Sequence, residues 1–205
     1  MSELRGKVAV ITGGGGMLPS AIAEGLAKDG VRCVLLDLVE EKAKAALQRV
    51  RQAGSEGLAI KVNVLSRVDL EKAAQETLKV FGRVDFLVNG AGGNHPRATT
   101  SKEVPFFDLP EDAVRFVFDL NFIGTFLACQ VFGRIMAEQG EGVILNIASM
   151  NAIRPLTRIP AYSAAKAAVA NFTQWLAVHM AQEYSPKIRV VAIAPGFFLT
   201  EQNRY

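Results

Sequence analysis

Short runs of apolar residues alternate along the chain with longer stretches in which apolar residues recur at every third or fourth position. This alternation predicts strands near residues 7–12, 31–37, 57–64, 84–89, 143–148 and 189–194, and helices near residues 20–28, 40–53, 68–81, 114–136 and 161–183. The strand segments are near-continuous Val, Ile and Leu runs, as in a parallel sheet with helices on both faces. We therefore expect a doubly wound α/β fold of three layers, in one domain over residues 1–205.

Two of the predicted helices, 114–136 and 161–183, are apolar around most of their circumference. Apolar side chains that face different directions on the second helix include Val169, Phe172, Trp175 and Val178. A helix of this kind must be buried on more than one side, either in one large core or against another subunit. Because one sheet offers little cover for both helices, we expect them to form a subunit interface in a homodimer or homotetramer.

Charge and composition exclude several classes of partner. The chain has 23 Lys and Arg residues against 20 Asp and Glu residues, a formal net charge of +3. An excess this small, spread along the chain, predicts no nucleic-acid partner and no anionic membrane surface. The uncharged run 167–182 contains Asn, Thr and Gln and is shorter than the roughly 20 apolar residues of a membrane span.

The N-terminus and the two cysteines indicate the compartment. The chain leads from a charged tip directly into the first strand, without the apolar core of a signal peptide. Cys33 and Cys129 lie inside apolar runs, which favours two buried, reduced thiols over a disulfide or a metal pair. We expect a cytoplasmic protein without a metal site.

The first predicted strand ends in four consecutive glycines, residues 13–16, just before the first predicted helix. Glycine lets the backbone approach a ligand closely, and the free N–H groups of a helix start suit a pyrophosphate. About 20 residues further on, the second strand ends at Asp37, where an acid accepts hydrogen bonds from ribose hydroxyls and repels a 2′-phosphate. The pattern favours NAD over NADP. The alternative is an ordinary glycine-rich loop, with Asp37 an exposed cap of the next helix.

These features resemble the short-chain dehydrogenase/reductase family over essentially the whole chain. Thr12 and Gly13 match the start of its T-G-x-x-x-G-x-G motif, although Met17 and Pro19 replace two glycines. Residues 89–92 match its N-N-A-G segment, with Gly90 in place of the second Asn. The resemblance implies a Rossmann-type fold and a dinucleotide site that comprises Gly13, Met17, Leu18, Asp37, Asn63, Val64, Asn89, Gly90, Ala91, Tyr162, Lys166, Pro195, Gly196 and Thr200. Family members continue through a substrate-covering segment and a seventh strand, which these 205 residues would lack.

The most specific signal for chemistry is a Tyr-x-x-x-Lys pair with a serine upstream. Tyr162 and Lys166 share one face of a predicted helix, and Ser149 follows the fifth strand, at the sheet edge where open α/β sheets bind ligands. A phenol has a pKa near ~10, and the ammonium of Lys166 and the positive nicotinamide of NAD⁺ would both favour its phenolate, so we expect both to lower the pKa of Tyr162. The family resemblance makes Tyr162 the acid/base and Ser149 a donor to the substrate oxygen. It also implies that Lys166 holds the nicotinamide ribose, and that Asn121 anchors a water that relays protons to Lys166.

Amides, one histidine and several arginines surround this predicted site. Arginine can bind a carboxylate through two contacts and amides bind hydroxyls, so the rim suits a polyhydroxylated carboxylate, unless these arginines are merely solvated. We expect the substrate to be bound by Asn94, Arg97, Ser149, Asn151, Arg154 and Tyr162.

Within the family, residues 89–96 and 149–152 are most similar to the D-mannonate oxidoreductase branch, which interconverts D-fructuronate and D-mannonate with NAD(H). Two alternatives remain open. One is the same chemistry on another ketone, such as a keto-gluconate or a 3-oxoacyl thioester. The other is a catalytically silent dinucleotide-binding module, which the replaced glycines of the first turn suggest.

Overall fold

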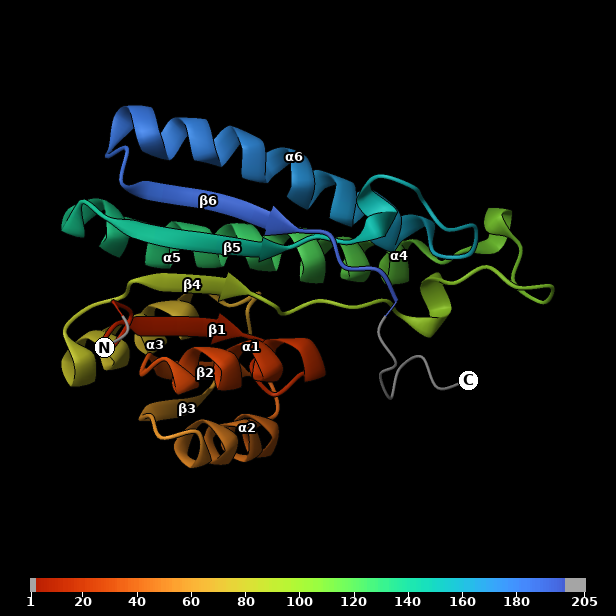
Figure 1. The fold of residues 1–205 in the computed structure, drawn as a ribbon. Helices are drawn as coiled ribbons and strands as arrows, with labels where there is room; N and C mark the ends of the chain where they lie inside the picture. The colour runs from red at the N-terminus through yellow and green to blue at the C-terminus, as the bar shows by residue number, and fades with distance from the viewer. Residues whose placement is uncertain (1–2, 198–205) are drawn as a thin grey trace.

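The computed structural model describes residues 3–197, and its centre is one parallel sheet of six strands in the order β3-β2-β1-β4-β5-β6 (Figure 1). The strands are β1 Val8–Thr12, β2 Arg32–Asp37, β3 Gly57–Lys61, β4 Phe86–Asn89, β5 Gly142–Ile147 and β6 Ile188–Ile193. The chain builds outward from β1 in one direction and from β4 in the other, so the strand order reverses between these two neighbours. The predicted doubly wound fold is confirmed, and its ligand crevice is expected at the carboxyl ends of β1 and β4.

Six α-helices cover this sheet. They are α1 Met17–Lys28, α2 Glu40–Gln52, α3 Arg67–Phe81, α4 Glu111–Phe118, α5 Gly124–Gln139 and α6 Pro160–Glu183. Val8 and Val10 of β1 belong to an apolar cluster with α3, α5 and α6, whereas Ala9 and Ile11 belong to a second cluster with α1 and α2. Since neighbouring residues of a strand face opposite sides, the two clusters are the two layers between sheet and helices.

The structure corrects two predicted boundaries near the glycine turn and β3. Helix α1 begins at Met17 instead of residue 20, because Pro19 lies in the first turn, where its missing N–H would have no intrahelical partner. Strand β3 ends at Lys61 instead of residue 64, because the side chain of Asn63 accepts a hydrogen bond from the N–H of Leu65 and turns the chain.

The helix predicted over residues 114–136 is longer and is interrupted. A π-helical segment, Asp119–Ile123, connects α4 to α5, so the helical stretch runs from Glu111 to Gln139. Asn121 lies inside this segment, fully buried, and its Nδ2 donates a 2.7 Å hydrogen bond to the carbonyl of Val117 one turn earlier. Widened turns of this kind often occur at functional sites.

The stretch Glu111–Gln139 is also long and apolar enough to cross a membrane, by length and composition only, and no other helix among residues 3–197 is. Half of its most apolar window (50%) is buried inside the protein. The core helix of a globular protein meets the same criterion, and α5 packs on the sheet through residues such as Phe132 and Met136. We therefore attribute its composition to the core.

Candidate active site

The four predicted catalytic residues, Asn121, Ser149, Tyr162 and Lys166, lie at one end of the sheet. They are placed there by the carboxyl ends of β4 and β5, the π-helical segment and the start of α6. Tyr162 and Lys166 lie in the first two turns of α6, and Ser149 directly follows β5. A Cβ atom added to Gly92 would lie 2.6 Å from Oδ1 of Asn121 and 3.3 Å from Nζ of Lys166. Both polar groups therefore flank the backbone of Gly92. Any residue other than glycine at this position would displace them.

Lys166 is held in an unusual environment for an ammonium group. Its side chain is only 5% exposed, and its Nζ donates a 2.7 Å hydrogen bond to the carbonyl oxygen of Ile147 at the end of β5. Among residues 3–197 no carboxylate forms an ion pair with it. Burial without a counter-charge lowers the pKa of Lys166 to about 8.

The effect expected of Lys166 on Tyr162 is wrong for this structure. Burial raises the pKa of the Tyr162 phenol above its usual range, and a hydrogen bond with Ser149 offsets only part of that rise. The ammonium of Lys166 is directed at Ile147 and lies 5.6 Å from the centroid of the Tyr162 ring. The phenol is therefore in its protonated form in this state, as an acid that delivers a proton must be.

Asn121 fixes the loop that follows β4. Its Oδ1 accepts a hydrogen bond from the N–H of Gly93 at 3.0 Å, and its Nδ2 donates to the carbonyl of Gly93 at 2.7 Å. With the bond to Val117, both amide protons are used, so a water at Asn121 would have to bind the remaining lone pair of Oδ1. No pattern along the chain indicates this contact with Gly93, since a single glycine in a glycine-rich loop is not distinctive.

The glycine turn between β1 and α1 has the form that a pyrophosphate needs. Gly13 has φ +61°, and a Cβ there would lie 2.8 Å from the backbone of Ala91. No side chain among residues 3–197 caps α1, so the N–H groups at its start, beside the exposed Met17 and the half-buried Leu18, have no side-chain partner in that part of the chain. An open helix start behind a close-packed glycine turn fits a dinucleotide phosphate.

Asp37 lies beside this turn, at the end of β2. One of its carboxylate oxygens accepts a 3.0 Å hydrogen bond from the N–H of Gly15, and the other accepts a 2.9 Å bond from the N–H of Val39, next to the start of α2. The carboxylate therefore holds the glycine turn and supports the start of α2. Each oxygen retains a lone pair, so these bonds leave room for ribose hydroxyls.

The other residues expected at the cofactor lie around the same edge. Thr12 Oγ1 accepts hydrogen bonds from the N–H groups of Gly90 and Ala91, which ties the end of β1 to the loop after β4. The side chain of Asn89 points into the core, where it donates to Asn146 and Cys129. Asn63 is exposed, whereas Val64 is buried. The carbonyl of Pro195 accepts a hydrogen bond from the N–H of Met150, and Gly196 is exposed. Thr200 lies outside the described residues.

Several expected substrate-binding groups already have partners. Arg97 donates from both terminal nitrogens to Asp112, at 2.9 and 3.0 Å. Asn94 donates to Thr99 at 2.7 Å, and Oδ1 of Asn151 accepts from the N–H of Leu156 at 3.2 Å.

By contrast, Arg154 is exposed and forms no ion pair within residues 3–197, and the same holds for Arg158. Both lie on the loop between Ser149 and Tyr162. Of the three arginines around the site, Arg97 is therefore paired with a carboxylate, whereas Arg154 and Arg158, without an ion pair in the described part of the chain, are free to bind an anionic ligand.

Residues 7–205 match the sequence profile described as short chain dehydrogenase. The chain belongs to the short-chain dehydrogenase family. It is 48% identical to the uncharacterized oxidoreductase UxuB of Bacillus subtilis over 209 residues, which cover 98% of this chain and 74% of that protein. It is 32% identical to the 5-keto-D-gluconate 5-reductase of Escherichia coli over 202 residues, which cover 98% of this chain and 76% of the relative.

Two solved structures with a bound nicotinamide dinucleotide share the fold. A Haemophilus influenzae protein provisionally named D-mannonate oxidoreductase, with bound NAD, is 43% identical and superimposes with a TM-score of 0.91 over 98% of this chain and 74% of its own. A xylitol dehydrogenase with bound NAD⁺ is 32% identical, with a TM-score of 0.88 over 95% of this chain and 72% of its own. The predicted family and the oxidoreductase class are confirmed.

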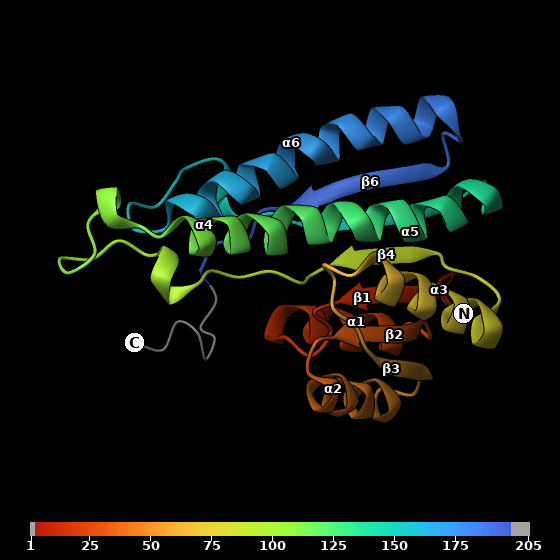
Figure 2. The same ribbon diagram turned by 180° about the vertical axis from the view of Figure 1, so that it is seen from behind.

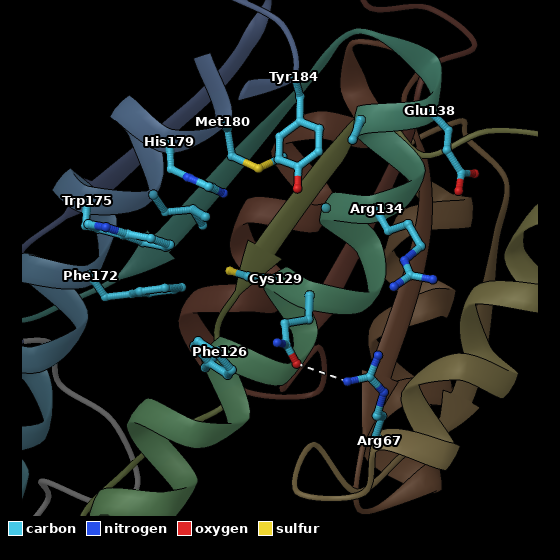
Figure 3. A pocket seen from close by; sticks show the side chains of 14 residues that line it. Arg67, Phe126, Cys129, Arg134, Glu138, Phe172, Trp175, His179, Met180 and Tyr184 are labelled. Carbon is cyan, nitrogen blue, oxygen red and sulfur yellow. Dashed lines mark hydrogen bonds between the residues drawn. The ribbon is translucent and has the colours of Figure 1, made fainter. Parts of the chain in front are cut away.

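This short-chain dehydrogenase has a second concave surface, which is more apolar than the site around Tyr162 and Lys166. A groove of about 580 Å³ lies between α5 and α6 (Figure 3), two helices that run alongside each other in Figure 2. Phe172, the exposed Trp175 and His179 stack along α6, while Arg134 and Glu138 of α5 lie across from them. Exposed apolar surface rimmed by polar residues often marks an interaction site.

Proposed function

We propose that this dehydrogenase uses NAD(H) to interconvert a secondary hydroxyl and a ketone on a sugar acid, with D-mannonate and D-fructuronate as the substrate pair. The observation that carries the sugar-acid assignment is the pair of unpaired guanidinium groups, Arg154 and Arg158, on the loop that joins Ser149 to Tyr162. A substrate carboxylate could form an ion pair with them and balance their positive charge. The similarity to a provisionally named D-mannonate oxidoreductase and to a 5-keto-D-gluconate 5-reductase supports the same substrate class.

The chain's own residues would handle the proton. Tyr162, whose pKa burial raises, donates its proton to the substrate carbonyl oxygen during reduction and recovers it during oxidation. The Ser149 hydroxyl donates to the same oxygen. Lys166 has a pKa of about 8 and can exchange protons near neutral pH with a water held by Asn121. The bound NAD(H) supplies or accepts the hydride.

NAD would be held along the crevice between β1 and β4. The turn from Gly13 to Leu18 would bind the pyrophosphate, Asp37 the adenosine ribose, and Asn63 with Val64 the adenine. The segment 89–91 and the α6 pair of Tyr162 and Lys166 would hold the nicotinamide ribose, with Pro195, Gly196 and Thr200 on the far side. The carboxylate of Asp37 would repel the 2′-phosphate of NADP, which favours NAD.

The substrate's carboxylate would bind Arg154, and its hydroxyls would bind Asn94 and Asn151 through their remaining polar atoms. The charge of Arg97 is already balanced by the carboxylate of Asp112, which accepts from both of its terminal nitrogens. Arg154 has no ion-pair partner within residues 3–197. We therefore assign the carboxylate to Arg154 rather than to Arg97.

The proposal includes a homodimer formed through α5 and α6 of two copies. A two-fold interface places one patch against itself, so the patch must be self-complementary. The residues that line the groove support such an arrangement, because its apolar floor around Trp175 could meet its copy while Arg134 of one subunit would pair with Glu138 of the other. Cytoplasmic assembly agrees with the two cysteines, which are buried free thiols whose pKa values burial raises to about 12.

The test is to titrate the protein with NADH by fluorescence and to assay NADH oxidation with D-fructuronate, 5-keto-D-gluconate and a 3-oxoacyl thioester. Fast turnover of D-fructuronate supports the proposal, and preference for another ketone changes the substrate but not the chemistry. Met17 and Pro19, in place of glycines, favour a second candidate, a silent dinucleotide-binding module. Tight NADH binding without turnover of any ketone would establish that candidate instead.

A further inference from the structure

The loop after β4 carries a histidine, His95, whose ring is held in place while one of its nitrogens is left without a partner in the described part of the chain. His95 forms the start of a short 3₁₀ helix, Pro96–Ala98, and is half-buried. On either side of it, Asn94 donates one amide proton to Thr99 and Arg97 is paired with Asp112. Within residues 3–197, the ring of His95 has no such donor contact.

The hydrogen bonds of His95 fix which nitrogen carries the proton. Its Nδ1 accepts a 3.1 Å hydrogen bond from the N–H of Arg97, so Nε2 is the ring nitrogen that is left to donate. The ring also contacts Phe116 edge-on, with centroids 5.7 Å apart, which restrains its orientation. Nothing within residues 3–197 accepts a hydrogen bond from Nε2. His95 thus presents an oriented donor.

The same loop is anchored beside the catalytic residues. Gly93 is bound at both backbone groups by Asn121, and Ala98 packs in a small apolar cluster with Ala161, against which Tyr162 also packs. His95 lies between these two anchors in the sequence. Its position is therefore set by contacts that also position the site.

We infer that His95 is a specificity-determining residue, whose Nε2–H donates a hydrogen bond to a hydroxyl oxygen of the substrate beyond the reacting carbonyl. This inference rests on the proposed function and deepens it. A fixed donor selects for a hydroxylated chain, because a ketone without hydroxyls would leave the donor unpaired on binding. The carboxylate remains with Arg154, so the two residues would recognise different parts of one acid.

The experiment separates the donor of His95 from its role in the turn. In His95→Gln, the amide nitrogen can replace Nε2 as donor, whereas the acceptor toward Arg97 is lost. In His95→Asn, the amide oxygen can replace Nδ1 as acceptor, whereas no donor reaches the position of Nε2. Lys102→Ala, an exposed residue of the same loop, is the control.

Each variant is assayed with D-fructuronate and with 5-oxohexanoate, which has the same carbon skeleton and ketone but no hydroxyls. If 5-oxohexanoate turns over too slowly, its inhibition constant against D-fructuronate replaces its kcat/KM. We expect His95→Asn to reduce the preference for D-fructuronate about tenfold, mainly through KM, and His95→Gln to retain most of it. The melting temperature should fall more for His95→Gln than for His95→Asn, since His95→Gln loses the hydrogen bond from the N–H of Arg97 that holds the turn.

A preference in His95→Asn within threefold of wild type would overturn the inference, as would an equal loss in both variants. Failure of the wild-type protein to reduce D-fructuronate rejects the proposed substrate alone. The variants are then tested on whichever hydroxylated ketone the panel identifies, with its deoxygenated analogue. A panel that yields no hydroxylated substrate overturns the inference as well.

Discussion

The Nζ atom of Lys166 donates its 2.7 Å hydrogen bond to the carbonyl oxygen of Ile147, and no carboxylate shares the site within residues 3–197. This bond ties α6 to the end of β5, and so ties the helix that carries Tyr162 to the central sheet. The ammonium that makes it is buried at a cost to folding, since its pKa is lowered to about 8.

We predict that Lys166→Met stabilises the protein while removing its activity. Between pH 8 and 10.5 the unfolded chain binds more protons at this lysine than the folded one, so wild-type stability rises with pH across that window. The variant lacks the buried charge, so its free energy of unfolding at pH 7 should exceed that of wild type by about 2 kcal/mol, after the lost bond to Ile147 is counted. Urea unfolding at pH 7 and pH 10 measures this, and the difference should shrink at pH 10.

Lys187→Met, which changes an exposed lysine, is the control and should leave the free energy of unfolding within about 0.5 kcal/mol of wild type. A Lys166→Met variant less stable than wild type at pH 7 would show that the hydrogen bond to Ile147 outweighs the burial of the charge.

Substitution of Asp37 should change the choice of cofactor. Asp37→Ala removes an acceptor for the ribose hydroxyls and the bond that holds Gly15, so NADH binding should weaken by roughly 2–3 kcal/mol, about 30- to 150-fold. Asp37→Asn retains an acceptor but not the charge. It should therefore weaken NADH binding less than Asp37→Ala does, while it reduces the discrimination against NADPH. Fluorescence titration with both nucleotides measures this. Equal use of NADH and NADPH by the wild-type protein would contradict the role of Asp37.

The groove between α5 and α6 predicts the assembly. Trp175 is 55% exposed in the isolated chain, so Trp175→Glu would place a charge in the apolar centre of the proposed interface. We expect light scattering to give a dimer for wild type and a monomer for Trp175→Glu. Val80→Glu, at an apolar residue of α3 that is 51% exposed, should remain dimeric. An active wild-type monomer would reject the interface.

The features that sequence predicted are those that depend on local spacing. Six strands follow from runs of apolar residues, and the shared face of Tyr162 and Lys166 follows from four residues of helix. The contacts that changed the picture join distant residues. Lys166 meets Ile147 across 19 residues and Arg97 meets Asp112 across 15, and no pattern along the chain marks either pair.

The direction of the Tyr162 pKa could not be predicted for the same reason. The sequence places an ammonium one turn away, but only the structure shows that Nζ is directed at the carbonyl of Ile147 and that burial of the phenol prevails. The interruption of the long helix at Asn121 is likewise a consequence of its contacts with Gly93 and Val117.

The most direct test of the proposed mechanism is the rate of NADH oxidation with D-fructuronate by wild type and by Tyr162→Phe, at NADH concentrations well above the dissociation constant of each. Wild type should turn over the ketone, and the variant should lose about a thousandfold in kcat while binding NADH within a few-fold of wild type, because the phenol acts on the proton in the transition state. A variant that retains more than about a tenth of the wild-type rate would contradict the assignment of Tyr162 as the acid/base.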